Sequence, residues 1–326
     1  MPHYLIHIGP HKTGTTYLQM LFRHLSLPLR ERGVLYSPRW IGDGTSGHSR
    51  LAQRLQAGND EDLAGEFDKL NASDYETVLI SAEDLSTMSR DSIGLLKSYL
   101  RGQQVSVVFY VRDWLALLPS SWQENVKHGR SMTLPEFMFE QFMNPFASNT
   151  INYAVRLDPF EQAFGRENVV LVSYKNIVDQ GGDLGEHFFR SFLSWPDAPL
   201  IKGIRPNPSL NILDIEVIRA LNALKPTKSS RRAASYLNTK PELDLSIALA
   251  AMESHRQALR VNEHAPNLQA VHDKVFESYG NCLVPPISGQ CFFFPQAGMV
   301  EYIKEGYLLM AGVRESLKAA CESIRE

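Results

Sequence analysis

The chain of 326 residues has a mass of 36.8 kDa and a formal net charge of −3, from 33 basic and 36 acidic side chains. At about 150 residues per domain, this length predicts two domains. The near-neutral charge argues against a general nucleic-acid coat, which needs a basic surface. Hydrophobic residues make up 44% of the chain and charged residues 21%, which is typical of a globular protein with a core.

Targeting and metal-binding patterns are also missing from the sequence. No apolar run approaches the roughly 20 residues that a membrane-spanning helix requires, and the first residues, MPHYLIHIGP, lack the basic start and apolar stretch of a secretory signal. The three cysteines, Cys282, Cys291 and Cys321, form no CxxC pair, so neither a zinc site nor a disulfide framework is supported. We therefore expect a cytoplasmic protein with no metal, no membrane span and no nucleic-acid partner.

Four short apolar runs have the composition of strands in a parallel sheet and end at polar or glycine-containing turns. They cover residues 4–8, 78–80, 105–111 and 169–172. Helical spacing of apolar residues follows between them, at 16–25, 93–100 and 114–126. We expect Pro28 to end the first of these helices and Pro119 to kink or delay the third. Strands that alternate with helices predict an α/β fold with a parallel sheet.

From about residue 209 the pattern changes to helices without strands. Helical spacing covers residues 210–221, 242–261, 267–278 and 298–324. Between the last two lie Pro285-Pro286 and the aromatic run Phe292-Phe293-Phe294-Pro295. We predict an α/β core over residues 1–205, a P-loop-like sheet flanked by helices, and a C-terminal helical extension over residues 206–326.

The most informative segment is Gly9-Pro10-His11-Lys12-Thr13-Gly14-Thr15-Thr16, which follows a predicted strand and opens a predicted helix. At such a junction the unpaired backbone N–H groups and the helix dipole bind anions. Gly14 lets the backbone approach the anion, Thr15 and Thr16 add hydroxyl donors, and Lys12 adds a positive charge. The two glycines have the spacing of the nucleotide-binding P-loop, GxxxxGK[ST], but a threonine occupies its lysine position. The segment therefore predicts a phosphate-binding loop with its charge on another side of the anion.

This segment resembles the 5′-phosphosulfate loop of the sulfotransferases that use 3′-phosphoadenosine-5′-phosphosulfate (PAPS), which reads PKSGTTW in cytosolic enzymes and PKTGTT in many carbohydrate-directed ones. The match is best to the bacterial, carbohydrate-directed branch, with His11 in place of the proline. The resemblance implies that Lys12 binds the bridging oxygen of PAPS and that Tyr17 lies near the adenine. It also implies that Gly14, Thr15 and Thr16 bind the 5′-phosphate. The predicted donor loop comprises His11, Lys12, Thr13, Gly14, Thr15, Thr16 and Tyr17.

The third predicted strand supplies a second match. It ends at Arg112, and Ser120 follows eight residues later inside the next helix. A 3′-phosphate calls for a guanidinium group and a neutral hydroxyl donor, and the family's 3′-phosphate motif has an arginine and a serine at this spacing. The family also has a tyrosine near the adenine where Tyr174 ends the fourth strand. Arg205 or Ser209, in a rigid polar loop, is expected to help close the donor site.

The base that deprotonates the acceptor has two candidates. Ligands of open α/β sheets bind beyond the carboxyl ends of the strands, and Glu83 follows the second strand, where relatives carry a catalytic histidine or glutamate. His48, in the glycine-rich segment 42–48, is the rival, and His11 adjoins the loop and could contact either substrate. The plain alternatives are a helix-capping role for Glu83 and a structural or solvated role for each histidine.

The resulting hypothesis is a PAPS-dependent sulfotransferase without a metal. Glu83 or His48 deprotonates a hydroxyl, or an amine, which attacks sulfur in line, and adenosine 3′,5′-bisphosphate leaves with its charge stabilised by Lys12. The alternatives are a P-loop nucleotide kinase, in which Asp113 would hold Mg²⁺, and a non-catalytic nucleotide-binding protein. The acceptor stays open among carbohydrates, lipids, small alcohols and phenols, and residues 206–326 are expected to wall its pocket.

Overall fold

The structure, a computed structural model, describes residues 1–58, 60–200, 212–224, 233–234 and 266–282. These described residues fall into two compact units. The first holds residues 1–58, 60–113, 147–200 and 272–282, and the second holds 114–146, 212–224, 233–234 and 266–271. The expected division into 1–205 and 206–326 differs from these units in two places, because residues 114–146 group with the second unit and residues 272–282 with the first.

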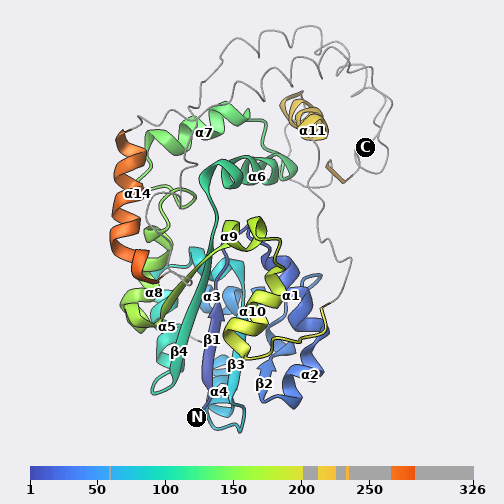
Figure 1. Ribbon diagram of the computed structural model, residues 1–326, viewed down its shortest axis with the longest axis vertical. Coiled ribbons are helices and arrows are strands. Elements are labelled where there is room, and N and C mark those ends of the chain that lie inside the picture. The colour runs from blue at the N-terminus through green and yellow to red at the C-terminus, as the bar shows by residue number, and fades with distance from the viewer. Residues whose placement is uncertain (59, 201–211, 225–232, 235–265, 283–326) are drawn as a thin grey trace. The chain divides into compact units, whose positions relative to one another are not determined.

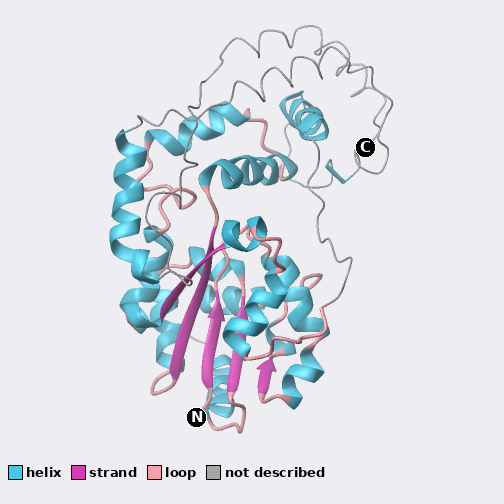
Figure 2. Cartoon of the chain, in the orientation of Figure 1, coloured by secondary structure: helices cyan, strands magenta, loops and turns pink. Residues whose placement is uncertain are grey.

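The first unit is built on a five-stranded parallel sheet with the strand order β2-β3-β1-β4-β5. The strands are β1 (His3–His7), β2 (Val34–Tyr36), β3 (Thr77–Ser81), β4 (Gln104–Val111) and β5 (Val169–Ser173). All arrows point the same way in Figure 2, and His7 of β1 lies opposite Ser81 of β3 and Val108 of β4. The predicted α/β fold with a parallel sheet is confirmed.

Helices cover both faces of this sheet (Figure 1). One face carries α1 (Thr15–His24), α2 (Ser26–Glu31), α9 (Tyr174–Asp179) and α10 (Leu184–Leu193). The other carries α3 (Ser49–Ala57), α4 (Glu61–Asn71), α5 (Arg90–Tyr99) and α8 (Ala154–Phe164). The short 3₁₀ helices are η1 (Pro38–Trp40), η2 (Glu83–Thr87), η3 (Arg166–Asn168) and η4 (Gly280–Cys282). The expectation for Pro28 is wrong: the chain starts a new helix at Ser26, and Pro28 lies in its first turn, where a missing N–H costs nothing.

The core follows the two-residue period of the strands. On one face Leu5 of β1 packs in a cluster with Phe22 of α1 and Phe188 of α10, whose rings are 4.8 Å apart. On the other face the neighbouring residue Tyr4 contacts Phe67 of α4, with 6.2 Å between ring centroids. Each such side chain contributes about 1.5–3 kcal/mol when fully buried, so both faces hold the strands in register.

The second unit is helical over its described residues. It contains α6 (Trp114–Lys127), α7 (Leu134–Met143), α11 (Ile212–Leu224) and the first residues of α14 (Pro266–Tyr279). The Asn222 side chain of α11 donates to the backbone oxygen of Val126 (2.8 Å), in the last turn of α6, and to that of Arg130 (3.0 Å), just beyond the helix. Pro119 lies within α6, which runs from Trp114 to Lys127. Of the two effects expected of this proline, a kink or a late start of the helix, the late start does not occur.

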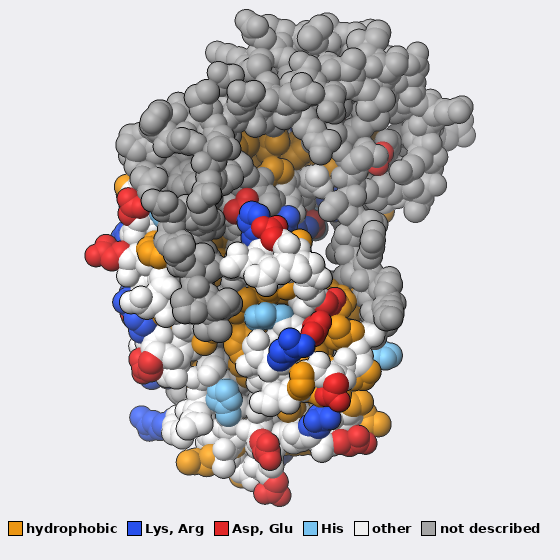
Figure 3. All heavy atoms as spheres, in the orientation of Figure 1, with side chains coloured by type: hydrophobic (Ala, Val, Ile, Leu, Met, Phe, Trp, Pro, Cys, Tyr) orange, Lys and Arg blue, Asp and Glu red, His pale blue; other side chains and the backbone are white. Residues whose placement is uncertain are grey.

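Several expectations for the C-terminal third fall on residues that the structure does not describe. The predicted helices at 210–221 and 267–278 correspond to α11 and α14. Those at 242–261 and 298–324, with the aromatic run 292–295, lie outside the described residues. Among the helices that are described, none is both long enough and apolar enough to cross a membrane. In Figure 3 acidic and basic side chains are interspersed over the described surface on the face drawn.

Candidate functional site

The carboxyl ends of β1, β3 and β4 lie side by side at one end of the sheet. β1 lies between β3 and β4, and the chain passes from β1 to the outermost strand β2 before it forms β3. The carboxyl end of β1 is therefore a point where the strand order reverses direction, and open α/β sheets bind ligands in the crevice at such points. The loop after β1, Glu83 after β3 and Arg112 after β4 all lie at this end of the sheet.

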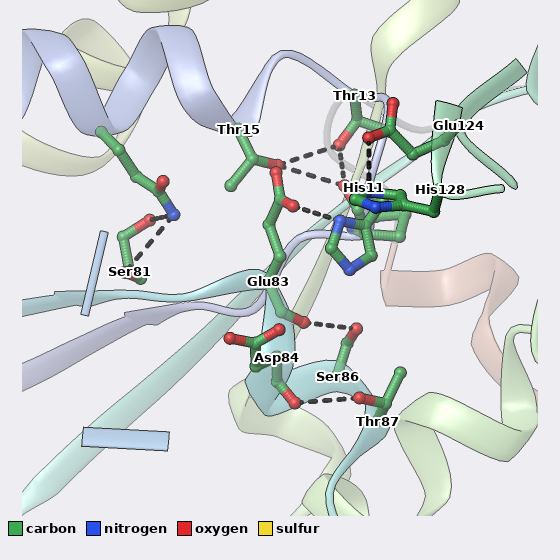
Figure 4. Close-up of polar contacts among 12 residues, drawn as sticks. His11, Thr13, Thr15, Ser81, Glu83, Asp84, Ser86, Thr87, Glu124 and His128 are labelled. Atoms are coloured by element: carbon green, nitrogen blue, oxygen red, sulfur yellow. Dashed lines mark hydrogen bonds and ion pairs between the residues drawn. The ribbon is translucent and has the colours of Figure 1, made fainter. Parts of the chain in front are cut away.

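The loop from Gly9 to Gly14 is braced from inside. The hydroxyls of Thr13 and Thr15 donate to the backbone oxygen of Pro10, at 2.7 and 3.1 Å, and both threonines are buried. Gly14 has φ 76°, and no side chain caps α1 at this residue. The backbone N–H groups of the first helical turn thus keep the capacity to bind an anion. The Thr15 hydroxyl, expected to face the phosphate, points instead into the loop (Figure 4).

Lys12 adopts a left-handed backbone conformation, with φ 69°. Its carbonyl accepts a hydrogen bond of 2.6 Å from Nη1 of Arg112. The backbone carbonyl of Arg112 accepts a bond of 2.6 Å from the Tyr153 hydroxyl, and the Arg112 guanidinium lies 5.4 Å from the ring centre of Tyr174. The structure therefore brings Arg112 and Tyr174, two residues predicted from strand ends, to the lysine of the loop.

Glu83 lies against the same loop, at the start of η2. A Cβ atom added to Gly9 would come within 3.4 Å of the Glu83 Cα, so the backbones are in contact. The Glu83 carboxylate is paired with Nδ1 of His11 (Figure 4). This hydrogen bond is the main reason that the pKa of His11 is raised above its ordinary value, although partial burial of the ring acts against it.

Arg156 and Ser86 belong to this site and carried no signal in the sequence. The Ser86 hydroxyl donates to the backbone oxygen of Glu83 (2.8 Å) and accepts from Nη1 of Arg156 (3.2 Å). Nε of Arg156 donates to the backbone oxygen of Asn149 at 2.5 Å. Burial lowers the pKa of Arg156, and the charge of Glu83 opposes that change. Arg156 comes from α8, far along the chain from Glu83, and no motif connects the two.

His48 does not lie in an open loop. Its side chain is 0% exposed and stacks on Tyr36, with ring centroids 4.1 Å apart, against the edge of Trp40. Nδ1 of His48 accepts from the backbone N–H of Ser81 at 3.3 Å, and burial lowers the pKa of His48 to about 3. A ring without solvent access cannot reach an acceptor, so the geometry argues against His48 as the base and favours the structural role.

The remaining predicted residues lie elsewhere. The Tyr17 hydroxyl, on α1, donates to both carboxylate oxygens of Asp183, at 3.0 and 2.9 Å, and Asp183 also caps α10. Ser120 is a half-buried residue of α6, in the second unit, whereas Arg112 belongs to the first. Arg205 and Ser209 lie outside the described residues.

A cavity of about 930 Å³ lies at the other end of the strands, where β1 and β4 begin. His3, Lys97 and Arg101 are among the residues that line it. The cavity therefore faces away from the loop that follows β1, and none of the predicted site residues lines it.

Neither a search for metal-binding groups nor comparison with known proteins assigns a function to the site. Within the described residues, no three His, Cys, Asp or Glu side chains are grouped so that they could hold a metal ion. No protein-family model, no curated protein and no solved structure matches the chain. The loop after β1, the neighbouring strand ends and their contacts are therefore the features that bear on function.

Proposed function

We propose that the chain is a sulfotransferase that moves a sulfuryl group from PAPS to a hydroxyl, or an amine, and releases adenosine 3′,5′-bisphosphate. The observation that carries the proposal is the loop of residues 9–14. It ends at an uncapped helix N-terminus and contains a lysine whose backbone is held by Arg112. The arrangement supplies an anion site with two positive side chains from neighbouring strand ends, which suits a nucleotide with two phosphate positions.

In this proposal the donor binds across the carboxyl edge of the sheet. The N-terminal amides of α1 and the helix dipole, equivalent to about half a positive charge, bind the 5′-phosphosulfate. Arg112 binds the 3′-phosphate, and Tyr174, beside its guanidinium, lies along the adenine. Ser120 and Arg205 remain predicted partners of the donor.

The chemical step is an in-line transfer at sulfur. A group beside the loop takes the acceptor proton while Lys12 stabilises the negative charge that develops on the departing phosphate oxygen. A sulfuryl group carries less negative charge than a γ-phosphoryl group, so lysine, arginine and backbone amides are sufficient in this scheme. The Glu83–His11 pair adjoins the loop, and both of its members can carry a proton.

Calorimetry with adenosine 3′,5′-bisphosphate, AMP and ATP tests the donor class. We expect the 3′-phosphorylated nucleotide to bind at least tenfold more tightly than AMP. Equal, weak binding of all three would overturn the proposal, whereas Mg²⁺-dependent preference for ATP would favour a nucleotide kinase.

The variant Arg112→Ala makes this test specific to the 3′-phosphate. A charged hydrogen bond contributes about 1.5–3 kcal/mol, so the variant should bind the bisphosphate roughly 10-fold to 150-fold more weakly. AMP should lose less affinity, through the lost contact to the Lys12 carbonyl alone. The matched control is Arg190→Ala, which removes an exposed arginine paired with Glu186 on α10. An equal loss for both nucleotides would show that Arg112 acts only on the loop.

A further inference from the structure

His11 and Glu83 form a histidine–carboxylate pair at the mouth of the loop. The His11 side chain is 52% exposed and that of Glu83 is 20% exposed, so the pair reaches solvent. The carboxylate bonds Nδ1 of the ring (Figure 4), which places the proton of the neutral imidazole on Nδ1. The lone pair is then on Nε2, at the opposite side of a partly exposed ring.

Glu83 is itself held in place for this contact. Its backbone carbonyl is bonded by Ser86, and Ser86 is bonded by Arg156. A carboxylate that is fixed in η2 and already engaged with His11 is suited to orient and stabilise an imidazolium. An imidazole, with an ordinary pKa near 6.5, is also better matched to proton transfer at neutral pH than a carboxylate, whose ordinary pKa is about 4.

We propose that His11 is the general base for the acceptor and that Glu83 is the positioning residue that orients it. This inference rests on the proposed sulfotransferase function. Nε2 of His11 takes the proton of the acceptor hydroxyl as the acceptor oxygen forms its bond to sulfur. The bond between sulfur and the bridging phosphate oxygen breaks, and adenosine 3′,5′-bisphosphate leaves with the electron pair. The imidazolium, stabilised by Glu83, then returns its proton to water.

The charges around His11 determine the expected pH dependence. The hydrogen bond from Glu83 and the charges of Glu83 and Asp84, both on η2, raise the pKa of His11. Burial and the charge of Arg156 on α8 lower it, and the net shift is upward. The base must be neutral to accept a proton, so turnover should rise with pH through a pKa above 6.5.

Two substitutions separate this mechanism from one in which Glu83 is the base. His11→Asn keeps an amide N–H near the position of Nδ1 and removes the base. We expect it to slow PAPS turnover by about 10²–10⁴-fold while adenosine 3′,5′-bisphosphate binding stays within threefold. Glu83→Gln keeps a hydrogen-bond acceptor, so it should cost less and shift the acid limb of the profile to lower pH. Near-full activity of His11→Asn beside an inactive, folded Glu83→Gln would overturn the proposal.

The assay follows release of adenosine 3′,5′-bisphosphate from PAPS with 4-nitrophenol, n-butanol, an N-acetylglucosamine trimer and water as probe acceptors. His11→Pro, which restores the proline of the resembled motif, is the second variant and should be as slow as His11→Asn. The matched control is His24→Asn, because His24 is an exposed histidine in the last turn of α1. Full turnover by His11→Pro would overturn the proposal.

An NMR titration of His11 tests the pair without any turnover. The pKa should lie above 6.5 in the unmodified chain and fall in Glu83→Gln, and an unchanged pKa would overturn the pairing. A chain that binds the bisphosphate but turns over PAPS with none of the probe acceptors would overturn the base role and leave the donor site standing. A chain that binds no 3′-phosphorylated nucleotide would overturn the proposed function, and the base role with it.

Discussion

Lys12 has both an unusual backbone conformation, with φ 69°, and a proposed role in the chemical step. An L-residue in the left-handed region costs on the order of 1–2 kcal/mol, and such residues persist where the surroundings hold them. Here the hydrogen bond from Arg112 to the Lys12 carbonyl, together with the braced loop, offsets that cost. The backbone conformation of Lys12 is therefore held by contacts within the chain itself.

Substitution of this lysine should separate chemistry from binding. In Lys12→Ala the charge that matters most as the leaving oxygen becomes negative is lost. We expect kcat to fall by more than tenfold, about 1.4 kcal/mol, while affinity for adenosine 3′,5′-bisphosphate changes little. Stopped assays of PAPS turnover and calorimetry measure the two quantities, with Lys97→Ala on α5 as a control. If affinity and kcat fell together, Lys12 would be a binding residue only.

Part of the candidate site can be predicted from the sequence, because the topology of a parallel sheet determines where its strand ends lie. Residues that follow parallel strands lie at one edge, so Lys12, Glu83 and Arg112 could be predicted to lie together. Arg156 could not, because it reaches Glu83 through Ser86 from a distant helix. His48 was misplaced because its glycine-rich surroundings suggested an open loop, whereas its ring packs in the core.

At the scale of elements, the sequence predicts four of the five strands of the sheet and misses β2. The four predicted strands correspond to β1, β3, β4 and β5. β2 has only three residues, too few to show alternation, and it is recognised only by its pairing with β3. The loop of residues 9–14 depends on the junction of β1 and α1, which the sequence predicts, and on α10, which it does not. Leu184 of α10 packs against Gly14.

The contact between Gly14 and α10 leads to a test of the junction. A Cβ at Gly14 would lie 2.5 Å from Cδ2 of Leu184, and φ is 76°. Gly14→Ala should therefore lower the free energy of unfolding by about 1–2 kcal/mol and weaken bisphosphate binding. Gly94 is the matched control: it lies in α5 with nothing within 4 Å of an added Cβ, so Gly94→Ala should stabilise by about 0.5–1 kcal/mol. Urea unfolding measures both, and equal effects of the two variants would contradict the junction geometry.

For the molecule as a whole, the first unit contains a buried polar cluster around Ser81. The Ser81 hydroxyl is 2.9 Å from Nδ1 of His7 and 3.3 Å from Nε2 of Gln19, and the Ser81 backbone bonds His48. Both histidines are 0% exposed. Among the described residues, Nε2 of His7 finds no hydrogen-bond partner. The cluster ties β1, β3 and α1 together only while both rings are neutral.

Burial makes these two histidines sensitive to acid. It lowers the pKa of His7 and of His48 from 6.5 to about 3 in the folded chain. The unfolded chain therefore binds more protons between pH 6.5 and pH 3, and stability is lost as the pH falls through that window. His11 acts in the opposite direction, since its pKa is raised, but its half-exposed ring makes that effect smaller.

The free energy of unfolding should therefore fall steeply between pH 7.5 and pH 5, above the range in which ordinary carboxylates titrate. Each buried histidine contributes about 2 kcal/mol to this fall, from 1.5 pH units below 6.5 at about 1.4 kcal/mol per unit. Urea unfolding at the two pH values measures it, and His48→Gln should remove about 2 kcal/mol of the pH-dependent part while lowering stability at pH 7.5. His24→Gln, which replaces an exposed histidine of α1, is the matched control. The same pH dependence in His48→Gln and in the unmodified chain would contradict this account. It would show that protonation of His48 does not lower the free energy of unfolding in acid.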